Sequence, residues 1–167
     1  KNQYNKSKGA GKLDSFNQEL MLRIMSEEER LVKDGDLTWY KHVNVKNNKG
    51  AFNFYITTDF ATSTRESADF STINVWAYNN NGDWLWVEGF CKRALMDESI
   101  DELFSLAQKY QPQEVGIEIT GQQGGFIAWI QNEMMNRNIY FTLATGKNSN
   151  SPGIRPYKDK MSRFQQM

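Results

Sequence analysis

A tight turn between two strand-like runs most constrains how this chain can fold. Residues 79–83 read Asn-Asn-Asn-Gly-Asp, and asparagine and glycine tolerate the positive φ angles that short hairpins require. Runs rich in aromatic and β-branched residues precede the turn over 72–78 and follow it over 84–90. The turn therefore predicts two adjacent antiparallel strands.

A third strand-like run lies upstream of this hairpin. Over residues 52–59, Phe52, Phe54 and Ile56 occupy alternate positions, as expected for one face of a strand. A polar loop over 61–68 then leads into the hairpin. Because strands that follow one another along the chain usually pair, the three runs predict an antiparallel meander.

Helical and strand patterns alternate after the meander. Ser99 and Glu102 fit a capping box, which predicts a helix that Pro112 ends. Residues 114–120 form a short run of valine and isoleucine, a second amphipathic helix follows, and 139–143 resemble a fifth strand. A right-handed crossover makes the last two strands parallel. The order strand-strand-strand-helix-strand-helix-strand predicts an α/β fold with a mixed sheet.

The first fifty residues differ from the rest. Residues 1–12 carry four lysines and no acid, which indicates a basic arm. Over 13–34, apolar residues recur at helical spacing, which predicts a helical lead-in. We therefore expect a basic arm and helical linker over 1–50 and one domain over 51–167.

Composition excludes several classes of protein. Twenty lysines and arginines offset twenty acids, so the chain is not a uniformly basic nucleic-acid coat. The single cysteine, Cys91, excludes a disulfide framework and a multi-cysteine zinc site, and we interpret it as a small core residue. The only histidine, His42, has no nucleophile near it in sequence that would indicate a catalytic triad. No apolar run approaches the roughly 18 residues of a membrane span, so no membrane partner is expected.

Two carboxylates stand at positions where an α/β sheet can bring them together. Asp59 ends the first strand, and Glu118 lies near the end of the fourth. If these strands are adjacent and parallel, both side chains emerge at the same edge of the sheet. Hard oxygen ligands of this kind suit Mg²⁺ or Mn²⁺, and a pair of such ions can activate water and stabilise the leaving oxygen of a phosphodiester.

Each of these acids also has a structural interpretation. Asp59 can cap the junction between strand and loop, and Glu118 can face solvent if the fourth strand is an edge strand. Asp69 follows Asp59 by ten residues, at the start of the second strand. It can reach the same cleft as a third ligand, or it can be a turn residue.

Two features suit the binding of phosphate groups. The glycine-rich loop that ends in Gly124 and Gly125 precedes a helix, where backbone N–H groups bind anions, although it also permits a tight chain reversal. The last part of the chain is basic, and its cations can line a phosphate groove or a solvated helix face. They are Lys147, Arg155, Lys158, Lys160 and Arg163.

The ribonuclease H-like fold has this order of elements, with its first and fourth strands adjacent and parallel. Within that fold, residues 13–167 resemble the nuclease domain of the large terminase subunit of tailed bacteriophages. The similar segments are 16–21 (FNQELM), 56–61 with 67–72 (ITTDFA, SADFST), 115–124 (VGIEITGQQG) and 158–163 (KDKMSR). In the family they are the lead-in, the first acidic strand with an Asp-plus-small-residue motif, the second acidic strand with its glycine turn, and a basic helix.

The resemblance implies a metal-dependent endonuclease that cuts concatemeric viral DNA during genome packaging. Asp59 and Glu118 would be the first two ligands of Mg²⁺ or Mn²⁺, with two ions expected. The implied partners are double-stranded DNA, a packaging ATPase domain, the small terminase subunit and the portal. The implied location is the cytoplasm of the infected bacterial host.

The sequence departs from the family pattern in two respects. It has no phosphate loop of a packaging ATPase, and it stops at Met167, before the family's third carboxylate, so we expect a domain truncated at its C-terminus. Two alternatives therefore stay open. The chain can be another ribonuclease H-like nuclease, such as a resolvase or transposase core, or a catalytically incomplete module for DNA binding or assembly.

Overall fold

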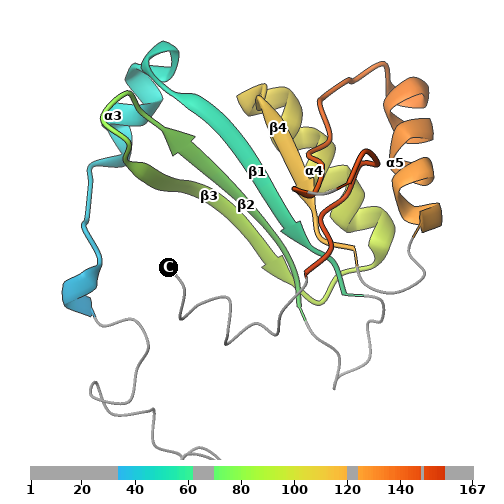
Figure 1. The fold of residues 1–167 in the computed structure, drawn as a ribbon. Helices are drawn as coiled ribbons and strands as arrows, with labels where there is room; N and C mark the ends of the chain where they lie inside the picture. Colours follow the sequence, from blue (N-terminus) through green and yellow to red (C-terminus); the bar gives the residue numbers. More distant parts are fainter. Residues whose placement is uncertain (1–33, 62–69, 120–123, 148, 157–167) are drawn as a thin grey trace, which may run out of the picture. The chain divides into compact units, whose positions relative to one another are not determined.

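The computed structural model describes residues 34–61, 70–119, 124–147 and 149–156 (Figure 1). The chain divides into two units, Lys1–Lys41 and His42–Met167. In the first unit, the described residues include one short 3-10 helix, η1 (Asp34–Asp36). The second unit has an α/β fold, in which helices pack against a mixed sheet.

The sheet has four strands in the order β3-β2-β1-β4. They are β1 (Asn53–Asp59), β2 (Ser71–Tyr78), β3 (Trp84–Lys92) and β4 (Glu114–Ile117). The pairs β1–β2 and β2–β3 are antiparallel, whereas β4 pairs in parallel with β1. This topology confirms the predicted meander and the predicted contact between the first and fourth strands.

The predicted hairpin turn is present between β2 and β3. The Asn79 N–H donates to the Asp83 carbonyl oxygen at 3.2 Å. The side-chain oxygen of Asn79 accepts hydrogen bonds from the N–H groups of Asn81 and Asp83, at 3.0 and 2.9 Å. Gly82 has φ of 91°, a conformation that residues with a Cβ rarely adopt. The turn chemistry of the sequence therefore accounts for the register of the hairpin.

A β-bulge changes which side chains of β3 face the helices. Trp76 pairs with Trp86, but the next residue of β2, Val75, pairs with Glu88, so that Val87 is an extra residue on β3. After the bulge, each residue of β3 faces the side of the sheet opposite to the one that simple alternation would give. Cys91 is consequently exposed, and its interpretation as a core residue is wrong.

The predicted fifth strand over 139–143 is reduced to an isolated bridge along the free side of β4. Leu143 forms a parallel bridge with Val115, which is evidence for the predicted parallel crossover. A loop then leaves the sheet, and the chain returns at Ile154, whose N–H donates to the Ile117 carbonyl oxygen at 2.8 Å. This second contact lies outside the predicted range, and within 139–143 only Leu143 forms a bridge.

Three α-helices and a second 3-10 helix occur in the described part of this unit. They are α3 (His42–Asn47), η2 (Lys49–Ala51), α4 (Met96–Tyr110) and α5 (Gly124–Arg137). The sequence did not predict α3. Within the described residues, no helix combines the length and the apolar character needed to span a bilayer.

The start of α4 differs from the prediction. The helix begins at Met96, three residues before the expected cap, and Ser99 is buried in its first turn. The Ser99 hydroxyl donates to the Leu95 carbonyl oxygen at 3.2 Å, so it makes no capping box. The helix ends as predicted before Pro112, through Gln111 in the left-handed conformation.

The core lies between one face of the sheet and α4. Its most buried members include Ile56, Ile73, Val75, Ile100, Leu103 and Phe104. Burial of each such side chain contributes about 1.5–3 kcal/mol, which explains why apolar residues alternate on the strands and recur at helical spacing on α4. Figure 1 shows α5 beside α4, and the Arg137 guanidinium bonds to the Asp101 carboxylate at 2.7 Å between them. We call the opposite face of the sheet the open face, where Trp84 and Trp86 are 57% and 52% exposed.

Candidate active site

Two carboxylates occupy neighbouring positions on adjacent parallel strands. The register pairs Thr58 of β1 with Ile117 of β4, so the next residues along the two strands are Asp59 and Glu118. The Glu118 N–H donates to the Thr58 carbonyl oxygen at 3.2 Å, which continues the pairing one residue past β4. We call Asp59 and Glu118 the acidic edge.

Burial indicates that both carboxylates belong to the open face. The residues on either side of each of them are buried, namely Thr58, Phe60, Ile117 and Ile119. Asp59 and Glu118 are themselves partly exposed. Because successive side chains of extended chain point to opposite faces, the two carboxylates point away from the core, on the same side of the sheet.

Glu118 is held between two neighbouring segments. On one side lies β1, and on the other Glu118 forms a parallel bridge with Ile154. The chain reaches this bridge through Gly153, whose φ is 102°. A Cβ at Gly153 would lie 2.6 Å from Cδ1 of Ile119, so a glycine is needed here. The fourth strand is therefore flanked on both sides at the position of Glu118.

A basic pocket, the loop pocket, lies next to this bridge. Its volume is about 540 Å³, and it is lined by Ile119, Gly146, Lys147, Ser149, Ser151, Pro152, Gly153 and Arg155. Lys147 and Arg155 are its charged residues, and none of its lining residues is acidic. Two of the predicted phosphate-binding cations thus line one pocket, whose wall includes the residue after Glu118.

The other predicted site residues cannot all be placed. Asp69, Lys158, Lys160 and Arg163 lie outside the described residues. Gly124 and Gly125 are the first two residues of α5, and no atom lies within 4 Å of a Cβ built on Gly125. Among the described residues, no group of three or more His, Cys, Asp or Glu side chains is placed to hold a metal ion. Within the described residues, the acidic edge is therefore limited to the two carboxylates of Asp59 and Glu118.

The open face carries a second feature that the sequence did not predict. The Trp76 indole N–H donates to the Thr57 hydroxyl at 3.0 Å, and the Trp86 indole N–H donates to the Asn74 side-chain oxygen at 3.0 Å. These bonds fix two large rings on the face to which Asp59 belongs. The sequence signal for these bonds was the presence of tryptophan, threonine and asparagine at alternate positions along the strands.

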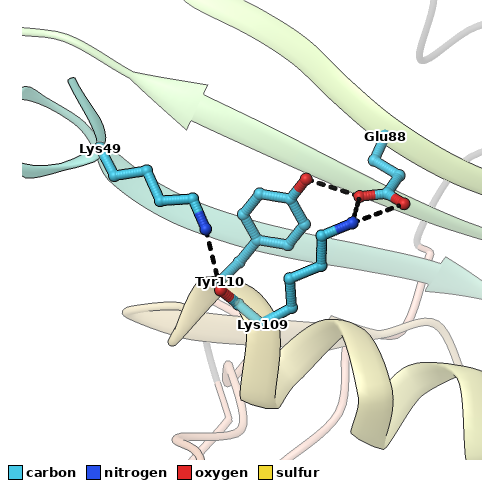
Figure 2. A network of polar contacts seen from close by, with 4 residues as sticks. All are labelled: Lys49, Glu88, Lys109 and Tyr110. Atoms are coloured by element: carbon cyan, nitrogen blue, oxygen red, sulfur yellow. Dashed lines mark hydrogen bonds and ion pairs between the residues drawn. The ribbon is translucent and has the colours of Figure 1, made fainter. Parts of the chain in front are cut away.

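A second polar site, the basic cavity, has a volume of about 570 Å³. Its lining residues are His42, Val45, Lys46, Lys49, Val87, Glu88, Lys109 and Tyr110. Figure 2 shows its network: the Lys109 ammonium lies 3.0 and 2.7 Å from the two Glu88 oxygens, and the Tyr110 hydroxyl donates to Glu88 at 2.5 Å. The Lys49 ammonium donates to the Lys109 carbonyl oxygen at 3.3 Å. Sequence reasoning missed this site because its residues come from four separate segments.

The network changes the acidity of Glu88. Burial alone would raise the pKa of this carboxyl, because it disfavours the charged form. The hydrogen bonds from Lys109 and Tyr110, together with the charges of Lys109 and His42, outweigh burial and hold the pKa of Glu88 below its ordinary value. Glu88 is therefore an ionised partner of Lys109 at neutral pH.

Comparisons with known proteins identify no family for this chain. No protein-family model matches it, and no curated protein matches it at a significant level. A functional assignment therefore depends on the residues and on the geometry of the acidic edge.

Proposed function

We propose that this chain is a metal-dependent DNA endonuclease domain of the kind found in the large terminase subunit of tailed bacteriophages. Its reaction would be the hydrolysis of phosphodiester bonds in concatemeric viral DNA during genome packaging. The observation that carries the proposal is the acidic edge, where Asp59 and Glu118 stand side by side on parallel strands. Two carboxylates at neighbouring positions can supply oxygen ligands to the same hard cation.

The topology supports a ribonuclease H-like fold. That fold requires an antiparallel meander whose first strand pairs in parallel with the fourth, as β1 does with β4. It also requires a fifth strand beyond the fourth, and the parallel bridges of Leu143 and Ile154 stand in that position. The acids then occupy the strand ends at which the nucleases of this fold bind metal.

The donor set fits Mg²⁺ or Mn²⁺, with two ions proposed. Carboxylate oxygens are the ligands that these hard cations prefer, and Asp59 and Glu118 supply them from a partly exposed face. When bound, such ions generate a nucleophile from water at neutral pH and stabilise negative charge on the phosphate. The role of Asp59 and Glu118 would be to hold the metal ions and orient them at one place on the sheet.

Positive side chains would hold the DNA backbone beside the acids. Lys147 and Arg155 line the loop pocket next to the Glu118–Ile154 bridge, so a phosphate bound there would lie close to the acidic edge. We propose that Lys158, Lys160 and Arg163 extend this groove. The start of α5 at Gly124 and Gly125 would add backbone N–H donors.

We propose a third carboxylate from a segment beyond Met167, with Asp69 as the alternative. Two carboxylates supply few of the roughly six oxygens that each ion requires, so water and phosphate would supply the rest. Mg²⁺ loses its water reluctantly, and we therefore expect Mn²⁺ to support more activity than Mg²⁺ in this chain.

The remaining partners are proposed on the same basis. They are a packaging ATPase domain, the small terminase subunit and the portal, with double-stranded DNA as the substrate and the host cytoplasm as the location. None of these partners is needed to test the hydrolytic activity itself.

A catalytically incomplete DNA-binding or assembly module is the second candidate. One observation favours it: the described residues contain no cluster of three or more potential metal ligands. Such a module would use Lys147 and Arg155 to bind DNA, and its two acids would have no catalytic role. Binding without cleavage distinguishes it from the nuclease.

Nicking of supercoiled plasmid by the full 167-residue chain tests the proposal. We expect nicking with Mn²⁺, weaker nicking with Mg²⁺, and none after addition of EDTA. Glu118→Gln should abolish it, because glutamine keeps the shape of the side chain and removes the charge that binds the cation. Glu114→Gln is the matched control, because Glu114 lies on the same strand and is exposed at its other end.

The outcomes separate the two candidates. EDTA-sensitive nicking that is lost in Glu118→Gln and retained in Glu114→Gln supports the nuclease. A gel shift of the same DNA with no nicking under any metal supports the incomplete module. Full activity in Glu118→Gln would rule out the assigned role of the acidic edge.

A further inference from the structure

The basic cavity lies away from the acidic edge, toward the opposite end of β1. The cavity includes Lys46 and Lys49, which precede β1, whereas Asp59 is the last residue of that strand. Figure 1 shows α3 at the start of β1, far along the strand from its arrowhead. The cavity volume of about 570 Å³ falls within the range of small-molecule sites. A role for this cavity is therefore independent of the nuclease proposal.

The cavity has more positive than negative charge. Glu88 is the one acid among its lining residues, and Lys109 and Tyr110 already bind both of its oxygens. Lys46 and Lys49 line the same cavity, and no described acid lies within ion-pair distance of either ammonium. A negatively charged ligand is therefore the kind that this cavity favours.

One of these lysines is already held in position. The Lys49 ammonium donates to the Lys109 carbonyl oxygen at the end of α4, and it lies 5.0 Å from the centre of the Tyr110 ring. An ammonium has three N–H donors, so the hydrogen bond to Lys109 leaves donors for a ligand. Ligand binding would therefore cost less side-chain entropy at Lys49 than at a surface lysine that rotates freely.

The wall of the cavity is apolar. Val45, Val87 and Tyr110 line it and are 1%, 7% and 7% exposed, so their side chains form a firm surface beneath the cations. A ligand that fits both parts has a compact anionic group and an apolar or aromatic body. A phosphate monoester carries close to two negative charges at neutral pH, which suits two lysines better than a single carboxylate does.

We propose that the basic cavity binds a phosphorylated small molecule with an apolar or aromatic body, of the class of a nucleoside monophosphate. Lys46 and Lys49 bind the phosphate group, and Val45, Val87 and Tyr110 contact the body. Glu88 fixes Lys109 and Tyr110 and sets the charge of the cavity.

Isothermal titration of the full chain with adenosine 5′-monophosphate tests this proposal, with adenosine and inorganic phosphate as separate probes. We expect the monophosphate to bind at least about tenfold more tightly than either probe, because it alone satisfies both parts of the cavity. Equal binding of inorganic phosphate and the monophosphate would overturn the proposal, and so would equal binding of adenosine.

Matched variants locate the binding. Lys46→Gln with Lys49→Gln should weaken monophosphate binding at least about tenfold, whereas Lys92→Gln with Arg93→Gln removes the same charge from exposed residues outside both basic pockets and should leave it unchanged. Circular dichroism checks that each variant is folded. Equal losses in the two double variants would show non-specific attraction and would overturn the proposal.

Glu88→Gln gives a test in the opposite direction. Glutamine can still accept hydrogen bonds from Lys109 and Tyr110, but the charge of Lys109 is no longer neutralised. We therefore expect tighter binding of the monophosphate by several-fold. Binding that is unchanged or weaker would contradict the assignment of the cavity as an anion site.

Discussion

The acidic edge and the basic cavity belong to one sheet but are built in different ways. Asp59 and Glu118 are brought together by backbone pairing of two parallel strands. Glu88 meets Lys109 and Tyr110 through side chains that reach from a strand to a helix. The first arrangement depends on strand register, whereas the second depends on contacts between side chains, in which a carboxylate meets its counter-ion. This difference suggests chemistry at the acidic edge and electrostatic stabilisation, with ligand binding, at the cavity.

The largest expected effect concerns the acidic edge as a single unit. We expect Asp59→Asn and Glu118→Gln each to reduce the plasmid cleavage rate by at least about a hundredfold, and the double variant to lose little more. Residues that hold the same ions act together, so their effects are not additive. Initial rates in Mn²⁺ for the four proteins give the comparison.

The same variants should keep or gain stability. Removal of one of two neighbouring negative charges relieves repulsion in the metal-free protein, so the urea midpoint should not fall. Additive losses of activity would indicate two separate roles for Asp59 and Glu118 and would contradict a shared site.

The backbone that supports Glu118 gives the next effect. Gly153→Ala should destabilise the protein by about 1–3 kcal/mol, because φ of 102° is strained for alanine and its Cβ would clash with Ile119. Gly125→Ala in α5 is the control, because no atom lies near its Cβ and alanine favours helices. Urea unfolding measures both. A stable Gly153→Ala protein would show that the loop does not hold Ile154 in place.

A smaller effect distinguishes the two basic sites. Lys147→Gln with Arg155→Gln should weaken binding of duplex DNA by about tenfold and lower the salt dependence by about one unit of slope per lost phosphate contact. Lys46→Gln with Lys49→Gln makes the same change of charge at the basic cavity and should leave the slope unchanged. Fluorescence anisotropy over a range of salt concentrations measures both, and equal slopes in the two variants would contradict the distinction.

The smallest effect is the pH dependence of Glu88. Its pKa is lowered in the folded protein, so its stabilising contribution is present at neutral pH and is lost as the pH falls from about 4.5 through the folded pKa. Glu88→Gln should therefore cost about 1 kcal/mol at pH 7, a modest value because the carboxylate is 36% exposed. The difference from the parent protein should shrink in acid. A difference that stays constant from pH 7 to pH 3 would contradict this account.

Much of the arrangement at the acidic edge follows from local sequence. The turn at Asn79–Asp83 gives the hairpin, and alternation gives the faces of β1. These are short-range rules, so a single sequence is enough to apply them. The neighbouring positions of Asp59 and Glu118 need one further step, because the parallel pairing of β1 with β4 was expected from the order of elements of the ribonuclease H-like fold.

The basic cavity could not be predicted in this way. Simple alternation along β3 would put Glu88 on the same face as Trp84 and Trp86, but the bulge at Val87 turns Glu88 toward α4. Neither the bulge nor the return of the chain to β4 at Ile154 has a distinct sequence signal, because both depend on packing between distant segments. The exposed position of Cys91 has the same cause.

A crystal of the protein soaked in Mn²⁺ tests the central claim most directly. If Asp59 and Glu118 form one metal site, anomalous scattering should show a peak within about 2.0–2.6 Å of an oxygen of each carboxylate. The peak should be absent from a crystal of Asp59→Asn soaked in the same way. A wild-type crystal with no peak between the two carboxylates, or with a peak on only one of them, would contradict a shared site.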